Sequence, residues 1–203
     1  LRNYLLRLGW SHKDKEIFSM KESIQYFNLS SIGKSPSKLD MERILSINEY
    51  YIKNFDEKVL YERLKIYSYQ YKKEIDEKYE KSLRSSIHFL KNKAKSLEDI
   101  YNNAKYIITN DIVIRPEELK LIDSLAKRII NEFLKKIENN DKLNKEVLEK
   151  HLKELISKHK TNFKGVGQPM RIALTGSKFG PGIYDIILSL DKTEVIKRLS
   201  KIK

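Results

Sequence analysis

Residues 116–137 have the sequence PEELKLIDSLAKRIINEFLKKI. Proline is favoured at the first position of a helix and acidic side chains are favoured in its first turn. Pro116, followed by Glu117 and Glu118, therefore predicts a helix start. The apolar residues that follow recur at helical spacing, among them Leu121, Leu125, Ile129 and Leu134. The stretch predicts one long helix from residue 116 to about residue 137, and with it a helical protein.

Signals for further helices lie on both sides of this stretch. Capping boxes, in which a serine and an acidic residue three positions later satisfy the first turn, occur at Ser19/Glu22 and Ser96/Asp99. Other starts are predicted at Asp40, Asp56, Asn144, Pro169, Pro181 and Asp191. The apolar run 112–114 is too short for a convincing strand. We therefore expect an all-α fold of small helical bundles.

The composition excludes several classes of protein. Apolar residues make up 40% of the 203 residues and 12 are tyrosine, which is too many aromatics for a disordered chain. There is no cysteine, which excludes disulfides and zinc–thiolate sites, and the four histidines lack metal-ligand spacing. We find no glycine-rich phosphate loop and no serine in a nucleophile elbow. We therefore expect no catalytic residue and no metal site in this chain.

The charge indicates a polyanionic partner. The formal net charge is +13 at pH 7, which favours nucleic acid over an anionic membrane. Residues 81–97 and 155–184 contain lysine and arginine but no acid, and aromatic residues lie in or beside both windows. Cations neutralise phosphate while aromatic rings stack on splayed bases, so this combination favours single-stranded RNA. The alternative is that such lysine-rich windows only keep a helical protein in solution.

The ends of the sequence and its hydropathy give three further expectations. No run approaches 18 apolar residues, so no membrane-spanning helix is expected. No signal peptide opens the chain. The first residue is Leu1 rather than methionine, and we expect the chain to be a piece of a longer polypeptide.

Three strings resemble one known family, the bacterial glutamyl-tRNA synthetases. They are LRNYLLRLGWSHKDKEIFS at 1–19, KLDMERILSINEYYIK at 38–53 and QPMRIALTGSKFGPGIYDIILSL at 168–190. The second is similar to the family's FDLEKL…N…YIR, and the third to its PLRxALTG…PGLF(D/E)(I/L)L. The third string is the most specific, whereas residues 56–115 match more weakly.

The resemblance implies the C-terminal, anticodon-binding part of a glutamate–tRNA ligase, a class I aminoacyl-tRNA synthetase that uses ATP in protein biosynthesis. Residues 1–55 would be the tail of the stem-contact region. Residues 56–115 and 116–203 would be two helical anticodon-binding subdomains. The family's HIGH and KMSKS-like motifs are absent, so ATP and Mg²⁺ would bind in a catalytic domain outside this chain, which needs no cofactor itself. The implied partner is tRNA(Glu), with tRNA(Gln) left open, for a cytoplasmic monomer without a membrane role.

The resemblance also implies site residues. The family arginine that reads the third anticodon base is replaced here by Lys93, which keeps the charge but lacks the planar fork of donors. The family arginine of PLRxALTG falls on Arg171. The first and second anticodon bases would meet the loop Gly180, Pro181, Gly182 and Ile183. From the two acid-free windows we add contacts to the phosphate backbone at Lys91, Lys95, Lys158, Lys164 and Lys178.

Structural alternatives accompany these assignments. Lys93 would also be favourable as a cation at a helix C-terminus. Arg171 could instead form an ion pair with Asp185. Pro181 could instead serve only as the first residue of a helix. For the chain as a whole, the alternative is a non-catalytic basic scaffold that binds acidic proteins.

Overall fold

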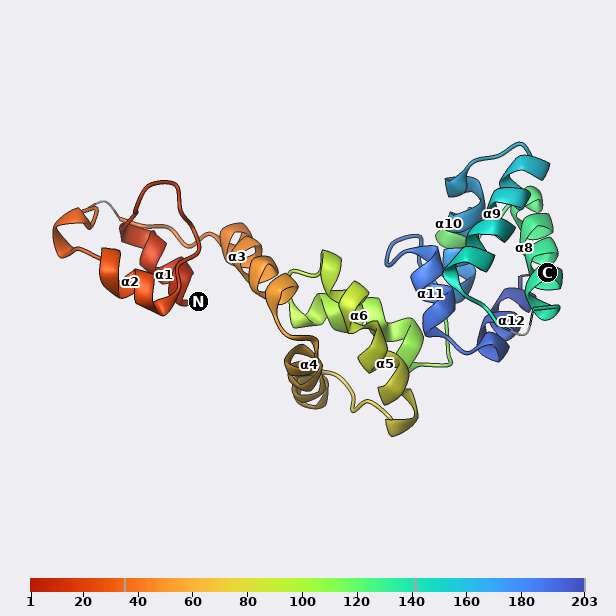
Figure 1. Cartoon of the computed structure of the whole chain (residues 1–203), viewed down its shortest axis with the longest axis horizontal. Coiled ribbons are helices and arrows are strands. Elements are labelled where there is room, and N and C mark those ends of the chain that lie inside the picture. Colours follow the sequence, from red (N-terminus) through yellow and green to blue (C-terminus); the bar gives the residue numbers. More distant parts are fainter. Residues whose placement is uncertain (35, 141, 203) are drawn as a thin grey trace.

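The computed structural model describes residues 1–34, 36–140 and 142–202. Within these ranges the chain forms twelve α-helices and two short 3₁₀ helices, with no strand, which confirms the all-α prediction. The helices follow one another along an elongated molecule, with the N-terminus towards one end and the C-terminus at the other (Figure 1). Ser35, Asp141 and Lys203, the last of which ends the third expected segment, lie outside the described residues.

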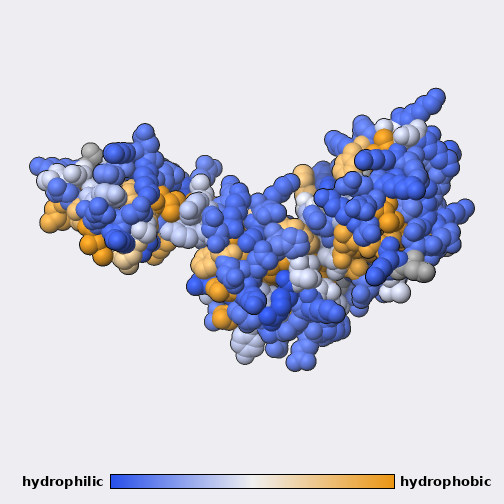
Figure 2. Space-filling view, viewed as in Figure 1, coloured by the Kyte–Doolittle hydropathy of each residue, from blue (hydrophilic) through white to orange (hydrophobic). Residues whose placement is uncertain are grey.

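The N-terminal part contains α1, α2, the 3₁₀ helix η1 and α3, which are Arg2–Gly9, Met20–Tyr26, Leu29–Ser31 and Met41–Asn54. Asn3 is buried and fixes the chain here, because its side chain accepts from the Phe18 N–H at 2.9 Å and donates to the Phe18 carbonyl at 3.2 Å. Apolar atoms gather on the surface at this end of the molecule (Figure 2), where Leu1, Ile24 and Leu29 are exposed.

The middle part contains α4, α5, the 3₁₀ helix η2 and α6, which are Glu57–Tyr71, Glu77–Leu90, Lys91–Lys93 and Leu97–Ile108. The predicted starts at Asp56 and Ser96 are confirmed: the Asp56 carboxylate accepts from the N–H of Val59 at 3.1 Å, and Ser96 with Asp99 forms the complete capping box. The buried faces of these helices pack into a common core, which positions η2 at the surface.

The C-terminal part contains α7 to α12, which are Pro116–Leu119, Ser124–Glu138, Lys145–Lys158, Phe163–Thr175, Ile183–Ser189 and Lys192–Ser200. In Figure 1, α8, α9 and α10 lie together at the end opposite α1. The loop between α10 and α11, residues 176–182, is called the α10–α11 loop below. It faces the middle part of the molecule, since α11 packs against α5.

The prediction of one helix over 116–137 is wrong. The chain leaves the helix after α7 because the Asp123 side chain accepts from the N–H of Ala126 at 2.8 Å and starts α8. A side chain that hydrogen-bonds the backbone in this way competes with a continuous helix. The turn still buries Ile122, so the apolar spacing continues across the break.

Two proline predictions also fail. Pro169 lies inside α10 instead of starting a helix, because Asn162 starts α10 upstream by accepting from the N–H of Gly165 at 2.9 Å. Pro181 does not occupy the first helical position, since α11 begins at Ile183 with Gly182 as its N-cap.

Arg198 joins the middle and C-terminal parts. Its side chain is 3% exposed. One terminal nitrogen donates to the carbonyls of Tyr106 and Leu174, both at 2.8 Å, and the other donates to the carbonyl of Thr109 at 3.0 Å. Its Nε pairs with Glu194 at 2.7 Å. The C-terminal ends of α6 and α10 are thus held by one guanidinium, which fixes how the two parts face each other.

Candidate nucleic-acid interface

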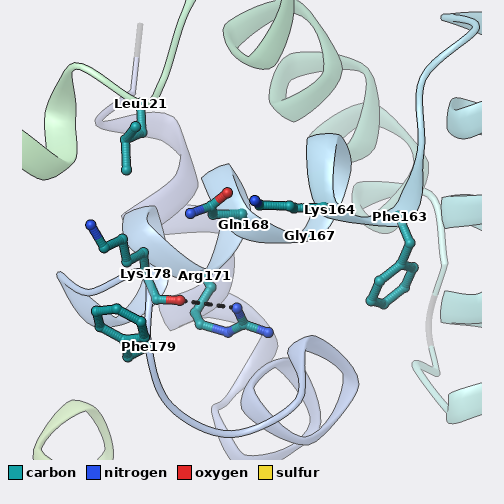
Figure 3. A pocket seen from close by; sticks show the side chains of 8 residues that line it. All are labelled: Leu121, Phe163, Lys164, Gly167, Gln168, Arg171, Lys178 and Phe179. Atoms are coloured by element: carbon teal, nitrogen blue, oxygen red, sulfur yellow. Dashed lines mark hydrogen bonds between the residues drawn. The ribbon is translucent and has the colours of Figure 1, made fainter.

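Arg171 holds the α10–α11 loop in place. Its Nε donates to the Pro181 carbonyl and a terminal nitrogen donates to the Lys178 carbonyl, both at 3.1 Å. Figure 3 shows the Arg171 side chain pointing towards the Lys178 carbonyl, with the bond between them dashed. The side chain is half-buried, and burial lowers the pKa of its guanidinium. The alternative of an Arg171–Asp185 ion pair is therefore not what the structure shows.

The loop presents an aromatic ring beside two glycines. Phe179 is 73% exposed, and the Nζ of Lys178 lies 5.3 Å from the centre of its ring. Gly180 has φ 135°, a conformation that side chains with a Cβ rarely adopt. Gly182 has φ −62°, and a Cβ there would come 3.0 Å from the Asp185 carboxylate. The loop therefore brings bare backbone to the surface beside an exposed ring.

Two clefts meet at Phe179. The first, here the outer cleft, has a volume of about 600 Å³ and is lined by Leu121, Phe163, Lys164, Gly167, Gln168, Arg171, Lys178 and Phe179. Figure 3 shows these side chains around the loop. The second, here the junction cleft, has a volume of about 340 Å³ and is lined by Phe89, Leu90, Asn92, Lys93, Asn103, Phe179, Gly180, Pro181, Gly182 and Asp185. The structure thus brings Lys93 together with Gly180, Pro181 and Gly182 in one cleft.

The predicted phosphate contacts fall into two groups. Lys95, Lys164 and Lys178 form no ion pair with any described residue, and neither does Lys93, which the resemblance assigns to the third anticodon base. Lys158 pairs with Glu132 at 2.9 Å, and this hydrogen bond lowers the pKa of the glutamate. The charge of Lys95 still acts on Glu49, whose pKa is lowered first by a hydrogen bond from Lys53 and further by Lys95. Lys164 and Lys178 are therefore the predicted contacts best able to bind phosphate.

Lys91 and Ile183 are corrections among the predicted site residues. The Lys91 side chain is only 14% exposed; its ammonium donates to the Phe55 carbonyl at 3.1 Å and pairs with Glu57 at 3.4 Å. It supports the start of α4 and has little surface to offer a phosphate. Ile183 is 1% exposed, because it is the first residue of α11 and faces the core. Its side chain is not available to pack against a base.

Phe179 and Asp185 belong to the clefts but are missing from the predicted site residues. The sequence holds a signal for each. Phe179 is an apolar residue between a lysine and a glycine, where no helical face requires it. Asp185 is the first acid after the acid-free window 155–184. Their place in the clefts depends on the packing of α11 against α5, which the sequence does not show.

No group of three or more histidine or acidic side chains that would hold a metal ion occurs among the described residues. None of the described helices is both long enough and apolar enough to cross a membrane.

Comparison with known proteins gives the family. The model of a family described as "Anticodon binding domain" matches residues 59–203. This chain belongs to that family. A glutamate–tRNA ligase of Pelagibacter ubique (strain HTCC1062) is 61% identical over 98% of this chain and 43% of its own length. Glutamate–tRNA ligase 2 of Rickettsia felis is 33% identical, over 98% of this chain and 43% of its own length.

A solved structure agrees with the sequence matches in fold. The crystal structure of a glutamate tRNA ligase from Elizabethkingia meningosepticum superposes with a TM-score of 0.83 at 24% identity, covering 99% of this chain and 40% of that one. The resemblance to glutamyl-tRNA synthetases is thereby confirmed for this anticodon-binding region. The chain spans less than half the length of the relatives that it matches.

Proposed function

We propose that this chain is the tRNA-binding part of a glutamate–tRNA ligase, which attaches glutamate to tRNA(Glu) with ATP. The chain reads the anticodon and catalyses no covalent step itself. The observation that carries the proposal is the junction cleft, in which Lys93 and the backbone of Gly180–Gly182 meet beside the exposed ring of Phe179. The family match over residues 59–203 supports the same function.

The chemistry of the two clefts assigns a task to each group. Lys164 and Lys178 neutralise the phosphates that flank the anticodon, and Lys93 donates to an anticodon base. Phe179 stacks on an unpaired base. The backbone of Gly180–Gly182 approaches a second base closely, because no Cβ at either glycine stands in the way. Arg171 holds the loop in the shape that this requires.

The remaining parts of the proposal concern the whole ligase. Residues 1–55 form the tail of its stem-contact region, and residues 56–115 and 116–203 form the two anticodon-binding subdomains. ATP and Mg²⁺ bind in the part of the ligase outside this chain. We take the ligase to be a cytoplasmic monomer. A second candidate partner is tRNA(Gln), because Lys93 lacks the planar guanidinium with which an arginine discriminates between bases.

Titration of tRNA(Glu) at increasing salt tests the electrostatic part. Each phosphate neutralised on single-stranded RNA contributes a log–log slope of about −0.7. We expect Lys164→Ala to weaken binding and to make the slope shallower by about that amount, since Lys164 is unpaired. Lys158→Ala is the matched control; it should change the slope less, because Glu132 already neutralises Lys158. Affinity that does not respond to salt, or equal effects of both substitutions, would argue against this account and favour the basic-scaffold alternative.

A further inference from the structure

We propose that Asp185 is a specificity-determining residue that selects an anticodon base with an exocyclic amino group and rejects uracil. The inference rests on the proposed function and assigns the junction cleft a base instead of a phosphate. Its basis is that Asp185, Asn103 and Lys93 line this one cleft without partners of their own.

The three side chains come from different elements. Asp185 lies in the first turn of α11, Asn103 lies in α6, and Lys93 ends η2. The carboxylate and the amide are half-buried, while Lys93 is exposed. The packing of α11 against α5 and of α5 against α6 fixes the cleft walls. The polar groups therefore face a common space from walls that the core holds still.

None of these three side chains makes a hydrogen bond or an ion pair with another described residue. Asp185 also makes no ion pair with Arg171, whose guanidinium holds the α10–α11 loop. Arg171 instead donates to the carbonyls of Lys178 and Pro181. A half-buried carboxylate without a hydrogen-bond donor is unfavourable. We infer that a bound ligand supplies the donor that Asp185 lacks.

Charge decides what kind of group that ligand presents. A carboxylate repels phosphate, so the phosphate groups of the RNA lie nearer the unpaired lysines than to Asp185. The donors of RNA are the ribose 2′-hydroxyls and the base edges, and only the base edges differ from one nucleotide to another. Carboxylates accept hydrogen bonds from base amino groups, such as N4 of cytosine.

The edge that fits also needs an acceptor for Lys93, which only donates. Cytosine, guanine and adenine each present an amino donor together with a ring or carbonyl acceptor. Uracil presents the O4 carbonyl where cytosine presents its amino group, and that oxygen would face the carboxylate of Asp185. The amide of Asn103 donates and accepts, so it adapts to the edge that Asp185 and Lys93 select.

The test is an affinity panel on the full 203-residue chain. Its probes are tRNA(Glu) transcripts carrying each of the four bases at each anticodon position. We expect the unmodified chain to prefer an amino-bearing base over uracil by about tenfold or more at one position. Asp185→Asn removes the charge and adds an amide donor that can pair with O4 of uracil, so it should reduce that preference at the same position and leave the other two positions unchanged.

Asp191→Asn is the matched control. Asp191 is exposed, and its side chain caps no backbone group of α12, so the substitution removes the same charge outside the junction cleft. It should shift affinity for every transcript equally. Asn103→Ala, on the opposite wall, should reduce discrimination at the position that Asp185 reads, which keeps the proposal testable if Asp185→Asn does not fold.

The outcomes distinguish failure of the Asp185 assignment from failure of the proposed function. If the unmodified chain discriminates among anticodons but Asp185→Asn and Asn103→Ala act uniformly, as Asp191→Asn does, the assignment of Asp185 is overturned and the proposed function stands. If the unmodified chain binds all transcripts equally, both are overturned.

Discussion

Replacing Arg171 by methionine should weaken tRNA binding by roughly 10- to 100-fold and leave the melting temperature nearly unchanged. Two hydrogen bonds from a charged donor to the carbonyls of Lys178 and Pro181 are lost, and the expected weakening corresponds to about 1.4–2.8 kcal/mol of binding free energy. The freed carbonyls belong to half-buried residues of a surface loop, where water replaces the lost donor. The loss therefore falls on the shape of the α10–α11 loop. A melting curve and a tRNA titration on one sample measure both quantities.

Arg171→Lys distinguishes this positioning role from simple charge. Lysine keeps the cation but lacks the planar fork that reaches two carbonyls at once. We expect Arg171→Lys to bind tRNA nearly as weakly as Arg171→Met. Full recovery of binding in the lysine variant would show that Arg171 acts through its charge alone, and the account of the loop would then be wrong.

Replacing Arg198 by methionine should lower the free energy of unfolding by about 3–5 kcal/mol, the range measured when one partner of a buried ion pair is removed. The substitution leaves three backbone carbonyls, at Tyr106, Leu174 and Thr109, without their shared donor. It also leaves the partly buried Glu194 with Lys197 as its remaining cationic partner, at 3.4 Å. Urea denaturation measures the change.

Lys197→Met is the matched control for this prediction. Lys197 neighbours Arg198 in the sequence and also pairs with Glu194, at 3.4 Å, but its side chain is 55% exposed. Exposed pairs typically contribute about 0–1 kcal/mol. Similar losses from both substitutions would mean that Arg198 contributes only as another surface charge.

The sequence predicts the helix starts better than their extents. Caps are local, so the capping box at Ser96 and the cap at Asp56 form as the sequence indicates. The break before α8 and the proline inside α10 depend on two further side-chain caps, at Asp123 and Asn162. The apolar spacing across both sites is compatible with either outcome, so periodicity alone does not decide them.

In the candidate site, too, the sequence indicates which segments take part, whereas packing between helices decides which side chains are accessible. Residue type and charge windows single out the segments that contain Lys93 and Arg171, and the structure brings Lys93 into one cleft with the α10–α11 loop. Whether a side chain in these segments is available depends on tertiary contacts. The pairing of Lys91 with Glu57 and the burial of Ile183 arise from packing between elements, as does the freedom of Asp185. None of these follows from residue type or spacing.

Nucleotide protection mapping of tRNA(Glu) by this chain tests the central claim most directly, namely that the junction cleft and the loop around Phe179 hold the anticodon. The account predicts protection of the three anticodon nucleotides by the unmodified chain, and loss of that protection in Arg171→Met at protein concentrations that still protect neighbouring phosphates. Protection confined to the stems, or no protection of the anticodon at any concentration that saturates binding, would contradict it.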